Sequence, residues 1–242
     1  MKALIFAAGL GERMRPLTNR TPKPLLVAGG KPLIVWHLEK LAAIGVRDVV
    51  INTSWLAEQF PATLGDGEHW GLRLQYSYEG ATPLETGGGM WNALPLLADG
   101  EATWLAVNGD IWSDYDFARL PRSIDGDAHL VLVDNPPQHP GGDFALSCER
   151  YVLGEGEPRF TFSGIGLYRP TLFTTWRTII GNTPGSGETP PRFKLAPLLR
   201  AAMRQQRVSG EYHVGRWTDV GTPERLARLD AELAAPSTEN EE

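Results

Sequence analysis

The chain has 242 residues, of which 42% are hydrophobic, and a formal net charge of −6 at pH 7. This length allows one large domain or two small ones, with enough apolar side chains for a substantial core. The negative charge and the lack of any basic run argue against nucleic-acid binding, which needs clustered Lys and Arg. No apolar stretch approaches the ~18 residues of a membrane span, and charges follow the first apolar run too soon for a signal peptide. A single cysteine, Cys148, excludes an internal disulfide and favours a reducing compartment, so we expect a cytoplasmic protein that binds no membrane.

The first 120 residues alternate between strand-like and helix-like patterns. Helical spacing of apolar residues or helix-forming composition marks three segments, at 31–46, 54–67 and 86–99. Strand patterns mark four segments, at 2–9, 48–54, 72–78 and 103–110. This alternation predicts a Rossmann-like α/β fold, in which a mostly parallel sheet has helices on both faces. Ligands of such sheets bind beyond the carboxyl ends of the strands, where Gly9, Gly11 and Asp110 lie.

The second half of the chain has a different pattern. Strand-like segments at 128–136, 143–153 and 159–168 follow one another with little helix between them, and helical patterns return at 193–206 and 222–235. No internal repeat or linker divides the chain. We therefore expect a single domain over residues 1–235, with halves at 1–120 and 121–235, and a disordered tail at 236–242.

Two residues that often carry chemistry are expected to be structural here. His37 lies among apolar residues of the first predicted helix, which favours a packed core histidine over a ligand. Cys148 alternates with Phe144 and Leu146 in a predicted strand, so we expect an inert cysteine inside the core. The histidines and this cysteine show no metal-ligand spacing.

A glycine-rich loop follows the first predicted strand. The segment 9–14, "GLGERM", has Met14 where a dinucleotide-binding loop needs its third glycine, and no Walker-type loop is present. A third interpretation is that the glycines let backbone N–H groups approach a triphosphate. Arg13 and Lys23 would then add positive charge beside the same phosphates, Arg as a planar fork and Lys as a point charge.

The run from Gly9 to Thr18, followed by Pro22-Lys23-Pro24, resembles the signature of the sugar-phosphate nucleotidyltransferases. These enzymes make nucleotide sugars from a nucleoside triphosphate and a sugar 1-phosphate. The resemblance implies that Arg13 and Lys23 are catalytic. It also implies a nucleotide site formed by seven residues, which are Ala8, Gly9, Gly11, Arg13, Lys23, Gly87 and Gly88.

Further segments extend this resemblance over nearly the whole chain. "PLETGGGMWNAL" is similar to the nucleoside-binding segment of the family, with Glu85 in place of the usual glycine. "VNGD" and "RWTDVGTPERL" match the motifs that carry two metal ligands, which implies that Asp110 and Asp219 hold Mg²⁺. "GGDF" and "FSGIGLY" fall where the family contacts the sugar. The resemblance thus implies a sugar-binding second half with contacts at Gly142, Ser163, Gly164 and Lys194.

One feature of larger relatives is missing. Their E-K-P segment carries a lysine that holds the sugar phosphate, and "GEGEPRF" has no lysine at that place. Lys194 is a plausible substitute, as is Arg192, and a surface lysine explains Lys194 equally well.

The combination "PLETGGG", "YDFARL", "LVLVDNP" and "FKLAPLLR" is most similar to the N-acetylmuramate α-1-phosphate uridylyltransferases of peptidoglycan recycling. UTP and a sugar 1-phosphate would be the substrates. A mannose-1-phosphate guanylyltransferase is the alternative within the class, and a non-catalytic nucleotide-sugar-binding regulator is the alternative outside it. A regulator would have no need for Asp110, Asp219 and Lys23 together. A dinucleotide-binding oxidoreductase is disfavoured by Met14, and the oligomeric state is left open.

Overall fold

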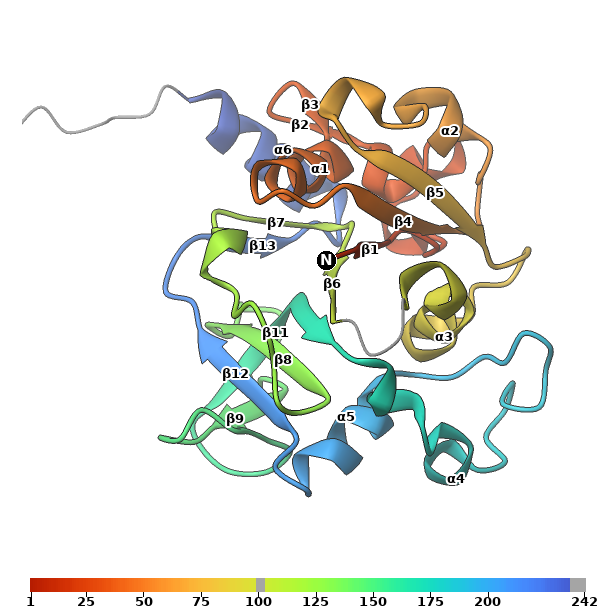
Figure 1. The fold of residues 1–242 in the computed structure, drawn as a ribbon. Coiled ribbons are helices and arrows are strands. Elements are labelled where there is room, and N and C mark those ends of the chain that lie inside the picture. Colours follow the sequence, from red (N-terminus) through yellow and green to blue (C-terminus); the bar gives the residue numbers. More distant parts are fainter. Residues whose placement is uncertain (99–102, 236–242) are drawn as a thin grey trace, which may run out of the picture.

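A computed structural model of the protein describes residues 1–98 and 103–235 (Figure 1). Among these residues, nine strands form the central sheet. Its first half is parallel, in the order β6–β1–β4–β5. The bounds of these strands are Ala3–Phe6 for β1, Asp48–Thr53 for β4, Arg73–Tyr78 for β5 and Trp104–Asn108 for β6. The carboxyl ends of the four strands therefore meet at one edge of the sheet, as the sequence predicts.

The long strand β11 joins the second half of the sheet to the first. It spans Arg159–Tyr168 and pairs antiparallel with β6, β8 and β9. Strand β12 adds a parallel pairing with β8, and β10 pairs with β9. The bounds of the added strands are Ala128–Val133 for β8, Phe144–Leu146 for β9, Val152–Leu153 for β10 and Val208–Tyr212 for β12.

Helices cover both faces of the sheet, which confirms the predicted architecture (Figure 1). Alternate residues of β1 divide between the two faces, because Ala3 and Ile5 pack with helix α1 whereas Leu4 packs with α3. The bounds of the helices are Leu33–Ala43 for α1, Gln59–Leu64 for α2, Glu85–Leu97 for α3, Trp176–Ile180 for α4, Ala196–Met203 for α5 and Pro223–Ala234 for α6.

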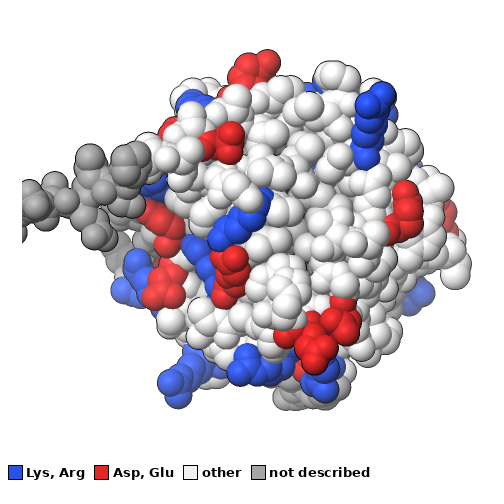
Figure 2. All heavy atoms as spheres, turned by 90° about the horizontal axis from the view of Figure 1, so that it is seen from above, with Lys and Arg blue, Asp and Glu red and all other residues white. Residues whose placement is uncertain are grey.

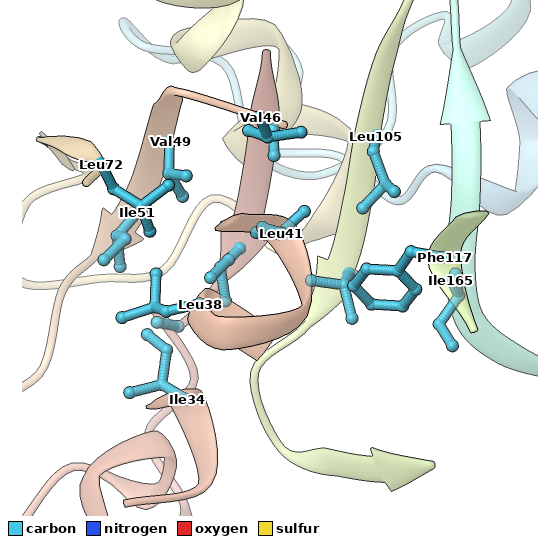
Figure 3. Close-up of a cluster of buried hydrophobic side chains, with 14 of the residues drawn as sticks. Ile34, Leu38, Leu41, Val46, Val49, Ile51, Leu72, Leu105, Phe117 and Ile165 are labelled. Carbon is cyan, nitrogen blue, oxygen red and sulfur yellow. The ribbon is translucent and has the colours of Figure 1, made fainter. Parts of the chain in front are cut away.

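Helix α1 shows how local sequence and packing agree. Ile34, Leu38 and Leu41 recur at helical spacing, and Figure 3 shows them in the cluster that also contains Val49 and Leu105. All five side chains are buried. The helix stops because Gly45, with φ at +82°, reverses the chain: the N–H of Gly45 donates to Ala42 and that of Val46 to Leu41.

The remaining elements are short. Two small ladders pair β2 with β3 and β7 with β13, both antiparallel. Their bounds are Val27–Ala28, Lys31–Pro32, Ile111–Ser113 and Trp217–Asp219. Single 3₁₀ turns cover Glu12–Met14, Leu17–Asn19, Lys23–Leu25, Glu68–Trp70, Phe117–Arg119 and Pro170–Phe173.

One expectation about the core is wrong. Residues 143–153 form a hairpin, β9 and β10, because the chain turns between Ser147 and Arg150. Arg150 adopts a positive φ of 65° in this turn. Cys148 therefore lies at an exposed turn and not in the core. The predicted tail at 236–242 lies outside the described residues.

Charged side chains of both signs lie next to one another on the face seen in Figure 2, and most of that face is uncharged. Ion pairs among the described residues include Lys31 with Glu39 and Arg216 with Glu232. The described residues include no helix that is both long and apolar enough to cross a membrane.

His37 is a core histidine, as expected, and its environment generates a test. Its ring is buried, and Nε2–H donates to the carbonyl of Ile111 at 3.0 Å. Burial lowers the pKa of His37 to about 4, although the hydrogen bond opposes this shift. The folded protein therefore keeps this ring neutral at pH values where the unfolded chain binds a proton.

The free energy of unfolding should consequently fall as pH drops from about 6.5 toward 4. The fall in the pKa of His37 from 6.5 to about 4 corresponds to a loss of about 3 kcal/mol in the free energy of unfolding from this residue alone. Urea unfolding of wild type and His37→Gln across this range measures the difference. The variant should lack this component, and parallel pH profiles would contradict the assignment.

Candidate active site

A cavity of about 710 Å³ lies at the carboxyl ends of β1, β4, β5 and β6. Its wall joins the glycine loop, the strand ends and the start of α3. The lining residues are Phe6, Ala7, Ala8, Gly9, Leu10, Gly11, Glu12, Arg13, Met14, Lys23, Pro24, Asn52, Glu79, Thr82, Pro83, Glu85, Thr86, Asn108, Asp110, Arg192 and Gly221. All five residues predicted in the loop region, and Asp110, are therefore brought to one cavity. Its volume lies within the usual range for a small-molecule site.

The loop after β1 has the open backbone that phosphate binding requires. No atom lies within 4 Å of the place where a Cβ of Gly9 would stand. Gly11 has a φ of +63°, and a Cβ there would stand 2.7 Å from the Thr18 side chain. The Thr18 hydroxyl donates to the Gly11 carbonyl at 2.7 Å, which fixes the turn. Arg13 lines the cavity, with no hydrogen bond or ion pair to any described residue.

Lys23 is the buried cation of the cavity. Its side chain is only 10% exposed, and Nζ lies 2.5 Å from Oδ2 of Asp110. A buried ammonium needs such a partner because burial without one is costly. In the structure the lysine therefore neutralises the same carboxylate that the sequence assigns to a metal.

The short β7–β13 ladder brings the second aspartate, Asp219, beside Asp110, although Asp219 itself does not line the cavity. Asp219 stands opposite Ile111, the residue after Asp110, and the N–H of Val220 donates to the Asp110 carbonyl at 2.8 Å. Two aspartates that are 109 positions apart in the chain thus become neighbours. Gly221, two residues after Asp219, lines the cavity.

Two residues hold the carboxylate of Asp219, and neither was predicted from the sequence. Its Oδ1 accepts hydrogen bonds from Arg225 Nη1 and Gln138 Nε2, each at 2.6 Å. Gln138 comes from the loop after β8 and Arg225 from helix α6. The only available signal was the position of Arg225 just after the "DVGTP" motif.

The donor set at the two aspartates suits Mg²⁺. Asp110 and Asp219 each have one carboxylate oxygen in a hydrogen bond, which leaves Oδ1 of Asp110 and Oδ2 of Asp219. No cluster of three or more His, Cys, Asp or Glu that could hold a metal occurs in the described part of the chain. Mg²⁺ commonly binds one or two carboxylates and takes its other oxygens from phosphates and water. The residues therefore fit a metal that binds together with a phosphate-bearing substrate.

A series of buried hydrogen bonds forms the floor of the cavity, and no sequence pattern indicated it. Oδ1 of Asn52 accepts the N–H of Ala7 at 2.6 Å, and Nδ2 donates to Glu79 Oε1 at 2.6 Å. The other oxygen of Glu79 accepts the N–H of Leu84 at 2.7 Å. Burial raises the pKa of Glu79, and these two hydrogen bonds oppose the rise. The series ties the ends of β1, β4 and β5 to the start of α3.

The glycines of α3 have a packing role in the structure, and their nucleotide contact stays a prediction. Neither Gly87 nor Gly88 lines the cavity, and both are buried. A Cβ at Gly87 would stand 2.6 Å from the Phe193 ring, and one at Gly88 would stand 2.4 Å from the Pro191 carbonyl oxygen. They therefore make room for the segment 191–194, which also bonds to α3 through the N–H of Gly88 and the carbonyl of Phe193 at 2.9 Å.

Glu85 and Thr86 line the cavity at the start of α3. Glu85 has a φ of +63°, a backbone conformation that non-glycine residues seldom adopt. The family's usual glycine at this position would adopt it without strain. The exposed side chain of Glu85 has no hydrogen bond or ion pair to a described residue. This strained residue at the mouth of the cavity marks a difference between this chain and the family pattern.

The predicted sugar contacts lie outside the cavity. Gly142 and Gly164 have positive φ values of 59° and 83°, and a Cβ at Gly164 would meet the cavity-lining Asn108 at 2.6 Å. Ser163 is buried, and its hydroxyl donates to the Val131 carbonyl and accepts the N–H of Ile165. Both hydrogen bonds hold that hydroxyl within the fold, and a sugar contact at Ser163 stays a prediction.

The structure distinguishes Lys194 from Arg192, the two residues considered for holding the sugar phosphate. Lys194 is exposed and does not line the cavity, whereas Arg192 does. Arg192 Nη2 lies 3.3 Å from Glu188, and its buried Nε has no partner among the described residues. Arg192 is thus the better placed of the two for contact with an anionic substrate.

Comparison with known proteins defines the family. Residues 2–144 match the nucleotidyl transferase family, and the chain belongs to it. It is 50% identical over 240 residues to an N-acetylmuramate alpha-1-phosphate uridylyltransferase of Neisseria meningitidis, covering 96% of this chain and 97% of that protein. It is 32% identical to a mannose-1-phosphate guanylyltransferase of Mycobacterium tuberculosis, covering 97% of this chain and 66% of that protein.

A solved structure from Bacillus anthracis, assigned as a glucose-1-phosphate thymidylyltransferase, has the same fold. The TM-score is 0.79 at 20% identity, over 99% of this chain and 98% of that one. The fold class predicted from the sequence is therefore confirmed, and so is the sugar-1-phosphate nucleotidyltransferase class.

The packing of α3 predicts that Gly88→Ala destabilises the protein. The added methyl group would overlap the Pro191 carbonyl, and such overpacking typically costs about 1–3 kcal/mol. Gly187→Ala is the matched control, because nothing lies within 4 Å of a Cβ there. Thermal unfolding should show a lower Tm for Gly88→Ala alone. Equal Tm values for the two variants would show that the segment 191–194 does not depend on this glycine.

Proposed function

We propose that this protein transfers the uridylyl group of UTP to N-acetylmuramate α-1-phosphate and releases pyrophosphate. The similarity to the Neisseria meningitidis protein carries the choice of substrates, because it extends over nearly the full length of both chains at 50% identity. The site supports the reaction class, since the glycine loop, Lys23, Asp110 and the Gly221 turn meet at one cavity. The product, UDP-N-acetylmuramate, would return recovered muramate to peptidoglycan synthesis in the cytoplasm.

The proposed step balances as a simple displacement. An oxygen of the sugar phosphate forms a bond to the α-phosphorus of UTP as the bond from that phosphorus to the bridging oxygen of the pyrophosphate breaks. The attacking oxygen is already anionic, so no general base is needed. What the site must supply is a fixed geometry and compensation for the negative charge that crowds around one phosphorus atom.

The described residues can meet these requirements. Backbone N–H groups of the loop at Gly9 and Gly11 would bind phosphate oxygens, and Arg13 would bind them from the side of the loop. Lys23, which lines the cavity beside Asp110, would bind a phosphate oxygen there. Loss of one such contact to a transition-state oxygen typically costs ~10²–10³ in kcat.

Asp110 and Asp219 would hold Mg²⁺ through their remaining carboxylate oxygens. Bound there, the ion would neutralise phosphate charge and help to align the attacking and leaving oxygens. The protein's own contribution is to keep the two carboxylates side by side through the β7–β13 ladder. This arrangement also argues against a regulator that only binds nucleotide sugars.

A second candidate is guanylyl transfer to mannose 1-phosphate. The similarity to the Mycobacterium tuberculosis protein favours it, at lower identity and over 66% of that protein's length. The two candidates share the phosphate chemistry and differ in base and sugar. A substrate comparison therefore distinguishes them.

Pyrophosphate release should be fastest with UTP, Mg²⁺ and N-acetylmuramate α-1-phosphate. The lactyl ether of muramate adds a carboxylate, and a charge-assisted hydrogen bond to it is worth about 1.5–3 kcal/mol, or roughly 10- to 150-fold in kcat/KM. The matched control is N-acetylglucosamine 1-phosphate, which lacks only that group. Equal kcat/KM for the two sugars would contradict the muramate assignment, and faster turnover of GTP with mannose 1-phosphate would favour the second candidate.

A further inference from the structure

Arg225 makes a short, largely buried ion pair with Asp219. Its Nη1 lies 2.6 Å from Oδ1 of the aspartate, and the two side chains are 13% and 27% exposed. Arg225 does not line the cavity, unlike Lys23. Its guanidinium therefore faces the carboxylate and not the space in which a substrate would bind.

At its position in helix α6, the positive charge of Arg225 is unfavourable unless an anion lies beside it. Thr222 caps the helix, its hydroxyl accepting the N–H of Arg225 at 3.4 Å, so Arg225 lies in the first turn. The exposed N–H groups of a first helical turn carry partial positive charge, which favours acidic side chains there and disfavours basic ones. A cation at this place needs a compensating anion, and Asp219 supplies it.

Gly221 provides the space that this ion pair occupies. A Cβ at Gly221 would stand 2.0 Å from Nη2 of Arg225 and 3.0 Å from Oδ2 of Asp219. Gly221 is not among the residues with positive φ, so the glycine leaves space for the guanidinium and is not needed for its backbone conformation. Gly221 therefore leaves the space in which the Arg225 guanidinium reaches Asp219, and Thr222 caps the helix that carries Arg225.

The ion pair determines which oxygen of Asp219 remains available. Oδ1 accepts from both Arg225 and Gln138, whereas Oδ2 has no hydrogen bond to a described residue. Without the guanidinium, only the Gln138 amide would hold Oδ1, and the carboxylate would be less constrained. With it, one oxygen is held and the other is presented in a fixed direction.

We propose that Arg225 is a positioning residue, which orients Asp219 so that its Oδ2 binds a divalent cation, with Gly221 making room for the guanidinium. The inference rests on the proposed metal-dependent reaction and assigns Arg225 no contact with substrate. Side chains that orient metal ligands in this way typically contribute 10- to 100-fold to metal affinity. We expect a loss of that order when the guanidinium is removed.

Mn²⁺ binding measures this effect without turnover. The free Mn²⁺ fraction, followed by electron paramagnetic resonance and corrected with protein-free samples for Mn²⁺ bound by the nucleotide alone, gives the Kd of the protein for Mn²⁺ in the presence of a non-hydrolysable UTP analogue. Arg225→Met should weaken Mn²⁺ binding about 10- to 100-fold. Arg225→Lys, which keeps the charge, should restore part of it. Gly221→Ala should weaken binding as well, because its methyl group displaces the guanidinium while Arg225 stays in the sequence.

Arg228→Met is the matched control. Arg228 lies in the same helix, has a side chain that is 64% exposed, and among the described residues pairs only with Glu232, at 3.8 Å. Its removal should leave Mn²⁺ affinity unchanged. In steady-state assays, Arg225→Met should raise the Mg²⁺ concentration for half-maximal rate more than it lowers kcat at saturating Mg²⁺. A merely structural role would lower the Tm and the active fraction, and the Mg²⁺ concentration for half-maximal rate would not change.

Two results would overturn the inference. One is a folded Arg225→Met with wild-type Mn²⁺ affinity, and the other is a loss of affinity in Arg228→Met as large as that in Arg225→Met. If Arg225→Met does not fold, Arg225→Lys and Gly221→Ala decide the matter by the same readout. Because no sugar is present, a wrong sugar assignment leaves this result unaffected. Wild-type Mn²⁺ binding that survives Asp219→Asn would instead show that the metal assignment itself is wrong.

Discussion

The antiparallel pairing of β7 with β13 is the constraint on which the candidate site depends. It joins residues more than 100 positions apart and places Asp219 beside the strand turn that carries Asp110. Neighbouring carboxylates repel each other unless cations lie near them. Lys23 pairs with Asp110 and Arg225 pairs with Asp219, so each carboxylate has a cation beside it.

The rest of the cavity follows from the parallel strands around it. Their carboxyl ends bring the loop at Gly11 beside Asn52 and Glu79, whose hydrogen bonds extend to the start of α3. Glycines matter here for two separate reasons. Gly11 supplies a positive φ, whereas Gly88 lets another segment pack against the helix. A polar, rigid floor beneath an open loop is suited to holding a charged nucleotide in one orientation.

The sequence predicted those features that depend on local pattern. Hydrophobic spacing revealed α1, the loop motif revealed Arg13 and Lys23, and strand ends pointed to Asp110. It missed what depends on tertiary contact, including strand β12, whose Ser, Gly and Glu residues hide its pairing with β8. It also missed Gln138 and Arg225, because nothing near them in the sequence shows that they meet Asp219. Cys148 was misplaced since alternation alone does not reveal a tight turn.

The proposed reaction requires that Asp110 and Asp219 hold one divalent cation between them. Anomalous diffraction at the manganese absorption edge can locate this cation in crystals grown with Mn²⁺ and a non-hydrolysable UTP analogue. We expect a single strong peak in contact with both carboxylates and with phosphate oxygens of the nucleotide. A peak held by other residues, such as Glu79 or Glu85, with the two aspartates still paired only to Lys23 and Arg225, would contradict it.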